Sequence, residues 1–254
     1  MVMVRRVAVL GATRGMGRAL ARALADRGDR VCLLGRDVDE LEKSAADLTA
    51  RGADAAVFVR CDLDRPDSFE SALDETVRLL QGLDVVIVTA ASFATQAHLE
   101  TDREQLRRLL TVNFVNTILF CEAARERLLA GLANGSTTRP TLCVFSSVAG
   151  ERGRKPVVFY GASKAGLSRY LEALDHKYFE AGLRVVCVKP GFVRTSMTEG
   201  LPAPPFAGEP DEVAIRVLRA IDRGTSVVYA PPIWAAVMAV IRLLPRRVMR
   251  RVGF

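Results

Sequence analysis

The chain contains 254 residues, of which 50% are hydrophobic and 26% charged, and its formal net charge is +7. No Ser/Pro-rich linker or internal repeat divides it, so we expect one domain with a large buried core. Five scattered cysteines without a Cys-x-x-Cys pair and only two histidines argue against a disulfide framework, a metal cluster and a Ser/His/Asp hydrolase. The apolar run before Gly11 is too short for the core of a signal sequence, which predicts a cytoplasmic protein.

The amino-terminal part of the chain predicts a strand, a tight turn, a helix and a second strand. Residues 6–10 form a short run that is apolar after Arg6, residues 18–27 are rich in Ala, Leu and Arg, and residues 31–34 are apolar again. The turn contains Gly11, Thr13, Arg14, Gly15, Met16 and Gly17. Glycines let a backbone approach a pyrophosphate, which is stabilised by the N–H groups and positive dipole of the following helix. The segment therefore predicts a dinucleotide site.

The end of the second strand indicates which dinucleotide binds. An NAD enzyme carries Asp or Glu there to bind the ribose 2′-hydroxyl, whereas this chain has Gly35 followed by Arg36. An arginine suits a 2′-phosphate, and Arg14 in the glycine turn offers a second cation to the same group. The sequence therefore favours NADP over NAD. The alternative is that Arg36 is a solvated loop charge.

Strand-like and helical segments continue to alternate to about residue 230. Apolar runs predict further strands at residues 55–59, 85–88, 141–145, 185–188 and 227–229. Helical stretches separate them, for example at residues 67–80 and 161–179. We therefore expect an α/β fold over residues 1–230, with a doubly wound, mostly parallel Rossmann-type sheet and helices on both faces. Residues 231–254 form an apolar and basic C-terminal extension of the same domain.

A serine, a tyrosine and a lysine are the candidate catalytic residues. A spacing of four residues puts Tyr160 and Lys164 on one face of a helix, where the ammonium lowers the pKa of the phenol toward neutrality. A phenol with such a pKa exchanges protons at cellular pH. Ser147 follows the apolar run of residues 141–145, at the strand end where an open α/β sheet binds ligands, and its hydroxyl can polarise a carbonyl. The alternatives are a solvated helix pair and, for Ser146 and Ser147, a turn or helix cap.

In this order, the motifs resemble the short-chain dehydrogenase/reductase family over roughly residues 5–230. The matching residues are Gly11, Gly15, Gly17, Asp62, Asn113, Ser147, Tyr160, Lys164, Pro190, Gly191, Val193 and Thr195. The resemblance implies that Asn113 holds a water relay to Lys164 and that Asp62 contacts the adenine. It implies that Val193 and Thr195 meet the nicotinamide amide. It also places further residues beside the cofactor, namely Leu63, Ala90, Tyr160, Lys164, Pro190 and Gly191.

The chain departs from the family pattern in two places, one segment and one single residue. The family usually has Asn-Asn-Ala-Gly after the fourth strand, where this chain has Thr-Ala-Ala-Ser at residues 89–92. The amide side chains that normally brace the sheet beside the cofactor are lost, and we expect Thr89 to replace part of that bracing. Leu10 stands where the family often has Thr, which removes a hydroxyl contact to the neighbouring turn.

The C-terminal extension is apolar and then basic. Residues 233–241 are apolar and include Trp234, but this run is too short to span a bilayer. Beyond residue 230 there are no acids and five arginines, which are Arg242, Arg246, Arg247, Arg250 and Arg251. The combination predicts an interfacial helix on an anionic membrane, the alternative being a core helix or dimer contact with a solvated basic end. Because the arginines lack interleaved aromatic residues, no nucleic-acid partner is expected.

Within the family, residues 146–154 and the terminal Leu-Pro-Arg-Arg pattern resemble the decaprenylphosphoryl-2-keto-pentose reductases, which reduce a keto sugar on a polyprenyl phosphate. The likeness implies a lipid-linked or membrane-resident carbonyl substrate. It places Arg152, Arg154 and Lys155 near the site entrance, available for a phosphate. A solvated charge run is the alternative interpretation of these three cations.

The sequence as a whole predicts an NADPH-dependent carbonyl reductase, or the reverse alcohol dehydrogenase, that forms a homo-oligomer. In this hypothesis Tyr160 protonates the alkoxide and Ser147 polarises the carbonyl. Lys164 lowers the tyrosine pKa and holds the nicotinamide ribose, and Asn113 supports proton refilling. One alternative is a 3-oxoacyl-thioester reductase. An alternative of another class is a non-catalytic NADP-sensing binding protein, against which the intact Ser, Tyr and Lys argue.

Overall fold

The centre of the molecule is a seven-stranded parallel sheet, seen in a computed structural model that describes residues 4–252. Its strands are β1 (Arg6–Leu10), β2 (Arg30–Gly35), β3 (Ala55–Arg60), β4 (Val85–Val88), β5 (Thr141–Phe145), β6 (Arg184–Pro190) and β7 (Val227–Ala230). Their order across the sheet is β3, β2, β1, β4, β5, β6, β7, and every pair is parallel. The order reverses between β1 and β4, which is the position where open α/β sheets bind ligands.

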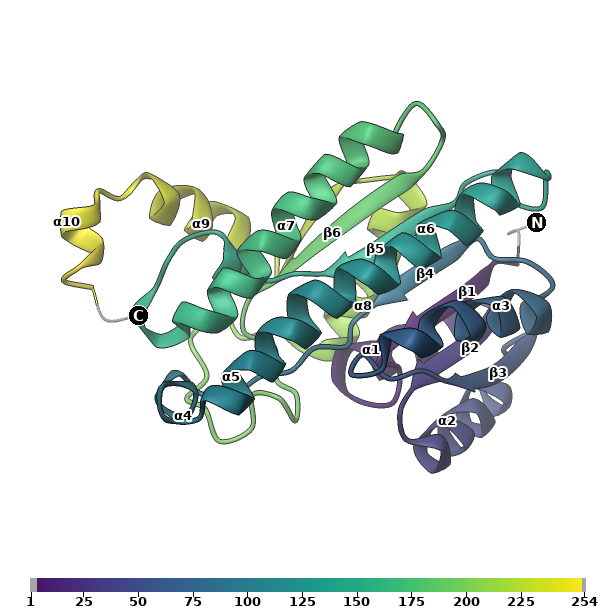
Figure 1. The fold of residues 1–254 in the computed structure, drawn as a ribbon, viewed down its shortest axis with the longest axis horizontal. Helices are drawn as coiled ribbons and strands as arrows, with labels where there is room; N and C mark the ends of the chain where they lie inside the picture. The colour runs from purple at the N-terminus through teal and green to yellow at the C-terminus, as the bar shows by residue number, and fades with distance from the viewer. Residues whose placement is uncertain (1–3, 253–254) are drawn as a thin grey trace.

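Helices cover both faces of this sheet (Figure 1). One face carries α1 (Gly15–Ala25), α2 (Val38–Ala50) and α8 (Pro210–Arg223). The other face carries α3 (Phe69–Leu80), α6 (Thr117–Ala133) and α7 (Val158–Tyr178). Side chains alternate along each strand, so that in β1 Val7 and Val9 join the first core and Ala8 and Leu10 join the second. The predicted doubly wound, Rossmann-type sheet with helices on both faces is confirmed.

The carboxyl edge of the sheet carries most of the irregular structure. Two short helices, α4 (Gln96–Thr101) and α5 (Arg103–Leu110), follow β4 and lead into a π-helical turn, Thr111–Asn116. A short 3₁₀ turn, Val148–Gly150, follows β5, and another, Lys155–Val157, precedes α7. A third, Pro66–Ser68, precedes α3. Because π turns in helices are frequent at functional sites, the turn that contains Asn113 indicates that the functional site lies at this edge of the sheet.

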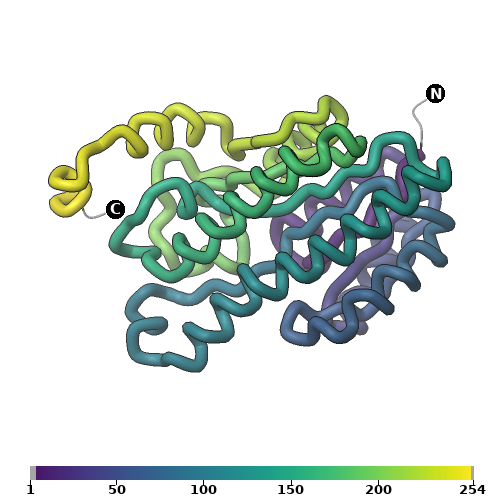
Figure 2. Tube along the Cα trace, turned by 45° about the horizontal axis from the view of Figure 1, so that its top comes forward, coloured from purple at the N-terminus to yellow at the C-terminus, as the bar shows by residue number. Residues whose placement is uncertain are grey.

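The C-terminal extension folds back onto the domain as α9 (Ile233–Leu243) and α10 (Arg246–Met249). Its inner face buries Met238 and Ile241 against Val148, directly after the predicted catalytic serine. In Figures 1 and 2 the extension reaches beyond the end of the sheet and lies beside the segment around residue 150. The inner face of α9 therefore agrees with the alternative in which this helix packs on the domain. Between residues 4 and 252, no helix is long and apolar enough to cross a membrane.

Two of the three cations expected at the site entrance hold this extension in place. The Nη2 atom of Arg152 donates to the carbonyl oxygen of Leu244 at 2.6 Å, and Nζ of Lys155 donates to that of Arg250 at 2.7 Å. Their chemistry is that of helix C-terminal capping, in which a cation satisfies carbonyls that have no partner within the helix. Arg152 and Lys155 thus each have one donor bound to the extension, and their availability for a phosphate stays a prediction.

Candidate functional site

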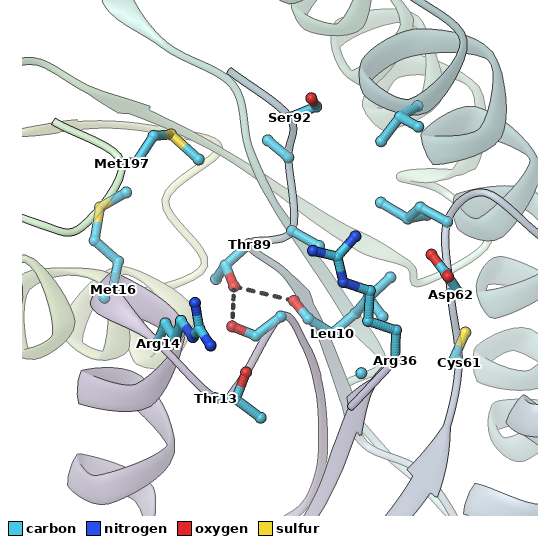
Figure 3. Close-up of a pocket in the computed structure, with 18 of the residues that line it drawn as sticks. Leu10, Thr13, Arg14, Met16, Arg36, Cys61, Asp62, Thr89, Ser92 and Met197 are labelled. Carbon is cyan, nitrogen blue, oxygen red and sulfur yellow. Dashed lines mark hydrogen bonds between the residues drawn. The ribbon is translucent and has the colours of Figure 1, made fainter. Parts of the chain in front are cut away.

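A pocket of about 370 Å³ lies at the carboxyl edge of the sheet, around the point where the strand order reverses (Figure 3). Predicted cofactor residues that line it are Gly11, Thr13, Arg14, Gly15, Met16, Gly17, Arg36, Asp62, Leu63, Ala90 and Thr195. Sequence reasoning missed Asp64, Arg108, Ser196 and Met197, which also line it. The remaining predicted residues, Tyr160, Lys164, Pro190, Gly191 and Val193, lie outside this lining.

The floor of the pocket is the glycine turn, which is packed too tightly for side chains. Gly11 has a φ of +89°, and a Cβ there would come within 2.7 Å of the backbone nitrogen of Ala90. A Cβ on Gly17 would overlap the carbonyl oxygen of Gly11. The start of α1 therefore lies directly on the turn, with its amides at the pocket wall, where a pyrophosphate is best stabilised.

Thr89 braces this turn, as expected from the departure at residues 89–92. Its hydroxyl lies 3.0 Å from the carbonyl oxygen of Leu10 and 3.2 Å from that of Gly11, and it donates to these two acceptors (Figure 3). The end of β4 is thereby tied to the first residue of the glycine turn. A single hydroxyl thus supplies part of the bracing that the family obtains from amide side chains.

Two cations reach into the pocket without a carboxylate partner. Arg14 and Arg36 point into the same space in Figure 3, and no ion pair involves either within residues 4–252. Asp37 follows Arg36 directly, but its carboxylate caps α2 by accepting from the backbone N–H of Glu40 at 3.2 Å. The end of β2 therefore presents a positive charge to the pocket, which suits a phosphate better than a ribose hydroxyl alone.

A further ion pair at the pocket wall joins Asp64 to Arg108. Nη2 of Arg108 lies 2.6 Å from Oδ2 of Asp64, and this hydrogen bond holds the pKa of the carboxyl below its usual range. The pair links the loop after β3 to α5. Because its members are distant in sequence and belong to no motif, periodicity and spacing gave no signal for them.

The predicted catalytic serine and tyrosine are brought together at the end of β5. Ser147 begins the turn Val148–Gly150, and its Oγ accepts a hydrogen bond from the backbone N–H of Ala149 at 3.0 Å. Its hydroxyl also lies beside the phenol of Tyr160 and acts to lower the pKa of that phenol. The helix-cap alternative for Ser147 is therefore correct as far as it goes, and it coexists with a contact to Tyr160.

Two glycines that sequence reasoning did not single out make this contact accessible. A Cβ on Gly150 would lie 2.6 Å from the carbonyl carbon of Lys164 in α7. A Cβ on Gly161 would lie 2.9 Å from the carbonyl oxygen of Ala149. The main chain of the serine turn thus rests directly on the main chain of α7, one residue after Tyr160. Gly150 lies three residues after Ser147 and Gly161 one residue after Tyr160, and this spacing was the available signal in the sequence.

The charge state of this site differs from the prediction. Burial raises the pKa of Tyr160 to about 12 and lowers the pKa of Lys164 to about 8. The Lys164 ammonium donates to the carbonyl oxygen of Phe145 at 2.8 Å and lies 5.9 Å from the centre of the Tyr160 ring. The predicted lowering of the phenol pKa by Lys164 is wrong for this structure, because desolvation dominates and the ammonium is directed at a backbone carbonyl. Tyr160 is consequently a protonated phenol at neutral pH.

Asn113 is fully buried in the π-helical turn, and both polar atoms of its side-chain amide hydrogen-bond the backbone of one residue. Its Oδ1 accepts from the backbone N–H of Ser92, and its Nδ2 donates to the carbonyl oxygen of Ser92, each at 2.7 Å. The next residue, Phe93, packs edge-on against the Tyr160 ring, with centroids 5.3 Å apart. Asn113 therefore fixes the segment that borders both the pocket and Tyr160. The water relay that the resemblance implies stays a prediction.

The segment after β6 holds the last predicted residues. Pro190 ends the strand, and its carbonyl oxygen lies 3.5 Å from Oγ of Ser147. Val193 is buried and bridges Gly208, so its side chain contributes to packing, whereas Thr195 reaches the pocket lining close to Gly15. The predicted pair of nicotinamide contacts is thus separated into one residue inside the lining and one behind it.

The comparisons to known proteins agree with the fold. The family model described as short chain dehydrogenase matches residues 5–204, and the chain belongs to this family. An uncharacterised oxidoreductase of Mycobacterium tuberculosis is 33% identical over 247 residues, 96% of each chain. Carbonyl reductase family member 4 of Xenopus tropicalis is 30% identical over 224 residues, 85% of this chain and 90% of that protein. A short-chain type dehydrogenase/reductase from Mycobacterium marinum superposes with a TM-score of 0.78 at 26% identity, covering 89% and 93% of the two chains.

Family membership makes the chain an oxidoreductase that uses a nicotinamide dinucleotide. The geometry fits that group, because the glycine turn leaves no room for side chains at Gly11 and Gly17 and the first residues of α1 line the pocket, where a pyrophosphate would be stabilised. Among residues 4–252, no cluster of three or more His, Cys, Asp or Glu side chains is arranged to hold a metal ion. All five cysteines are buried free thiols.

Replacing Thr89 with Val tests the bracing of the glycine turn. Valine keeps the shape and loses the hydroxyl, so the turn loses its link to β4 and the dissociation constant for the dinucleotide should rise about 2- to 10-fold, the value of one net hydrogen bond. Isothermal titration calorimetry measures the change. Thr89→Ser is the matched control because it retains the hydroxyl, and equal affinities of the valine variant and the wild type would show that the bond does not support binding.

Proposed function

We propose that this protein is an NADPH-dependent carbonyl reductase that converts a ketone into a secondary alcohol or catalyses the reverse reaction. The observation that carries the proposal is that the Ser147 turn packs main chain to main chain on α7, next to Tyr160 and Lys164, beside a pocket suited to a dinucleotide. When bound, the nicotinamide supplies the hydride. The chain itself has to orient the carbonyl and provide the proton.

The proton comes from Tyr160 in the reductive direction. A phenol with a pKa of about 12 is fully protonated at neutral pH, which is the form that donates to a developing alkoxide. Ser147 offers a second hydroxyl to the same oxygen, and so stabilises the charge that forms on it. Lys164, which is still largely protonated near neutral pH, compensates the negative charge left on the phenol. The reverse reaction needs the phenolate, and its rate should increase as the pH rises.

The preference for NADP is supported by charge at the adenosine end of the pocket. Arg14 and Arg36 are the two cations without an acidic partner there, within the described residues. A 2′-phosphate would satisfy both guanidinium groups with charged hydrogen bonds, whereas a 2′-hydroxyl leaves one or both unmatched. We therefore infer that the chain discriminates between the two dinucleotides through Arg36.

Tyr160→Phe should remove the proton donor while preserving the ring that contacts Phe93. Because the phenol is the proposed proton donor, turnover should fall by about 10² to 10⁴, the usual value of general acid catalysis. NADPH oxidation with a panel of ketones measures this, and Ser147→Ala should lose rate in the same assay. Unchanged NADPH affinity in both variants is the control. Retained turnover in Tyr160→Phe would refute the assignment, and no turnover in the wild type would favour a non-catalytic NADP-sensing protein.

Arg36→Ala should separate the two cofactors. A charged hydrogen bond contributes about 1.5 to 3 kcal/mol, so the variant should bind NADPH roughly 10- to 100-fold more weakly and leave NADH nearly unchanged. Titration of both dinucleotides against wild type and variant measures the difference. Equal wild-type affinities for NADH and NADPH are incompatible with the proposed preference.

An anionic substrate is supported by Arg154, the third cation of the expected entrance group. Its Nε is buried and has no hydrogen-bond partner within residues 4–252, and burial lowers the pKa of its guanidinium. A buried N–H donor without an acceptor is costly unless a ligand supplies the acceptor. A phosphate on a lipid-linked carbonyl or on the carrier of a 3-oxoacyl thioester would do so. Reduction of the 3-oxoacyl thioester is the alternative function. A ketone panel that includes both kinds of compound distinguishes the two substrates.

The outer face of α9 and α10 supports contact with an anionic membrane. Val240 is 63% exposed and Leu243 is 85% exposed, beside the five arginines of a segment that has no acids. Such a surface combines apolar side chains with unbalanced positive charge, as interfacial helices do. Trp234 does not belong to this face, because its indole is turned inward.

We also propose a homo-oligomer, supported by the exposed side chains of Val115 and Leu119, one helical turn apart on the outer side of the domain.

Vesicle flotation tests the membrane contact. The wild type should float with vesicles containing phosphatidylglycerol at low salt and remain below with phosphatidylcholine alone, since each arginine contributes about 1 kcal/mol at an anionic surface. Replacing Arg246, Arg247, Arg250 and Arg251 with Gln should abolish flotation without disturbing the buried face of α9. Lys43→Gln, on α2, is the control for loss of an exposed charge. A wild type that stays below in every condition would contradict the proposal.

A further inference from the structure

The loop between β6 and α8 forms one wall of the dinucleotide pocket and is closed at its base. Thr195, Ser196 and Met197 in this loop line the pocket. Its two ends meet through the backbone, because the N–H of Gly208 donates to the carbonyl oxygen of Phe192 at 2.9 Å and the N–H of Arg194 donates to that of Gly208 at 3.0 Å. We call residues 191–208 the pocket loop. Whatever holds its base therefore sets where its tip stands over the bound dinucleotide.

The base of the pocket loop is held by the first residues of the C-terminal extension. The N–H of Gly191 donates to the carbonyl oxygen of Ala230 at 3.0 Å. The Trp234 indole covers Gly191 so closely that a Cβ on this glycine would overlap the ring. On the other side of the base, a Cβ on Gly208 would lie 2.7 Å from the Pro231 ring. Both ends of the loop thus rest against residues 230–234.

Trp234 also reaches the loop itself. Its Nε1–H donates to the carbonyl oxygen of Phe206 at 3.2 Å, while its ring packs on Gly191 at the other end of the loop. One side chain therefore contacts the pocket loop at two points far apart along the loop. Indole is the side chain best suited to this, because it combines a large rigid apolar face with a single N–H donor.

The helix that carries Trp234 is fixed to the catalytic side of the domain. Met238 and Ile241, one and two turns further along α9, are buried against Val148. Arg242 lies 3.2 Å from the carboxylate of Glu151, which also accepts from Lys189 in β6 and from the Tyr229 hydroxyl. Glu151 itself is almost fully buried, and these partners hold its pKa below the usual range. α9 is thereby attached to the turn that follows Ser147.

We propose that Trp234 is a positioning residue that holds the pocket loop closed over the dinucleotide, so that the C-terminal extension sets cofactor affinity. The inference rests on dinucleotide binding by this family and is independent of the proposed substrate and of the NADP preference. Without the indole, the base of the loop loses its apolar cover at Gly191 and its hydrogen bond at Phe206. A loop that is in its binding position only a tenth of the time lowers the apparent affinity about tenfold.

Three measurements test the proposal with the full chain. Trp234 is the only tryptophan, so its fluorescence reports on this contact alone. Titration with oxidised NADP and oxidised NAD, which do not accept energy from tryptophan emission, should shift the Trp234 emission, because the bound dinucleotide contacts the loop that the indole holds. Calorimetry on Trp234→Ala should give a dissociation constant about tenfold above that of wild type. In steady-state kinetics the KM for the dinucleotide should rise by a similar factor, with kcat at saturation changed much less.

Three further variants separate positioning from a general loss of stability. Trp234→Phe keeps the apolar cover and loses the hydrogen bond, so its affinity should lie between those of wild type and Trp234→Ala. Gly208→Ala presses the base of the loop against Pro231 from the opposite side and should also weaken binding. Leu243→Ala, on the same helix but 85% exposed, should match wild type. The Trp234→Phe measurement decides the question if Trp234→Ala does not fold.

The outcomes distinguish this inference from the function it rests on. Wild type that binds a dinucleotide with no change in Trp234 emission, together with Trp234 variants of unchanged affinity and KM, would overturn the positioning role while leaving the reductase proposal intact. Wild type that binds neither dinucleotide would overturn both. Weakened binding in Trp234→Ala, Trp234→Phe and Gly208→Ala, but not in Leu243→Ala, supports the role.

Discussion

The arrangement of the proposed catalytic residues depends on a contact between two pieces of main chain, the turn Val148–Gly150 and the first turns of α7. Gly150 and Gly161 leave no side-chain atoms between them, so the turn that begins at Ser147 rests on the helix that carries Tyr160 and Lys164. Main-chain packing of this kind is stiffer than contact through long side chains, which rotate between rotamers. The serine hydroxyl is therefore held in place beside the phenol before any substrate arrives, which is the preorganisation that acid catalysis requires.

The same close packing explains the electrostatics of the site. Lys164 is buried and Tyr160 is partly buried, and burial disfavours the charged form of each, so their pKa values move in opposite directions. The backbone carbonyl of Phe145 then gives the ammonium its one strong acceptor. An acid that remains protonated and a cation that remains charged near neutral pH are both useful when a carbonyl oxygen gains negative charge. A packing constraint and a chemical requirement are satisfied by one arrangement.

The parts of this structure that are local in sequence were predictable. Each strand is an apolar run bounded by turn residues, and the glycine turn has its strand and helix on either side, so the sheet and much of the pocket lining follow from short segments. Thr89 was also predictable, because a hydroxyl at the end of β4 faces the carbonyls of the neighbouring turn in a parallel sheet.

The features that could not be predicted depend on residues far apart in the chain. Asn113 finds Ser92, and Arg108 finds Asp64, only after the sheet has formed. The direction of the Lys164 ammonium was likewise inaccessible, since the helical spacing to Tyr160 says which face it shares but not which acceptor that face meets. For this reason the predicted direction of the Tyr160 pKa shift was wrong. The choice of Tyr160 itself rested on its motif. A pKa is a property of the surroundings, which spacing does not specify.

The C-terminal extension combines both cases in one helix. Trp234, Met238 and Ile241 are spaced by four and three residues and share the inner face of α9, whereas Val240 and Leu243 share the outer face. Composition alone, with a tryptophan and apolar residues before a run of arginines, describes an interfacial helix and a docked helix equally well. The deciding factor is what each face meets. The inner face meets a glycine whose missing side chain leaves room for an indole, and Arg152 and Lys155 meet carbonyls at the ends of α9 and α10, so the extension is part of the domain before its outer face contacts anything else.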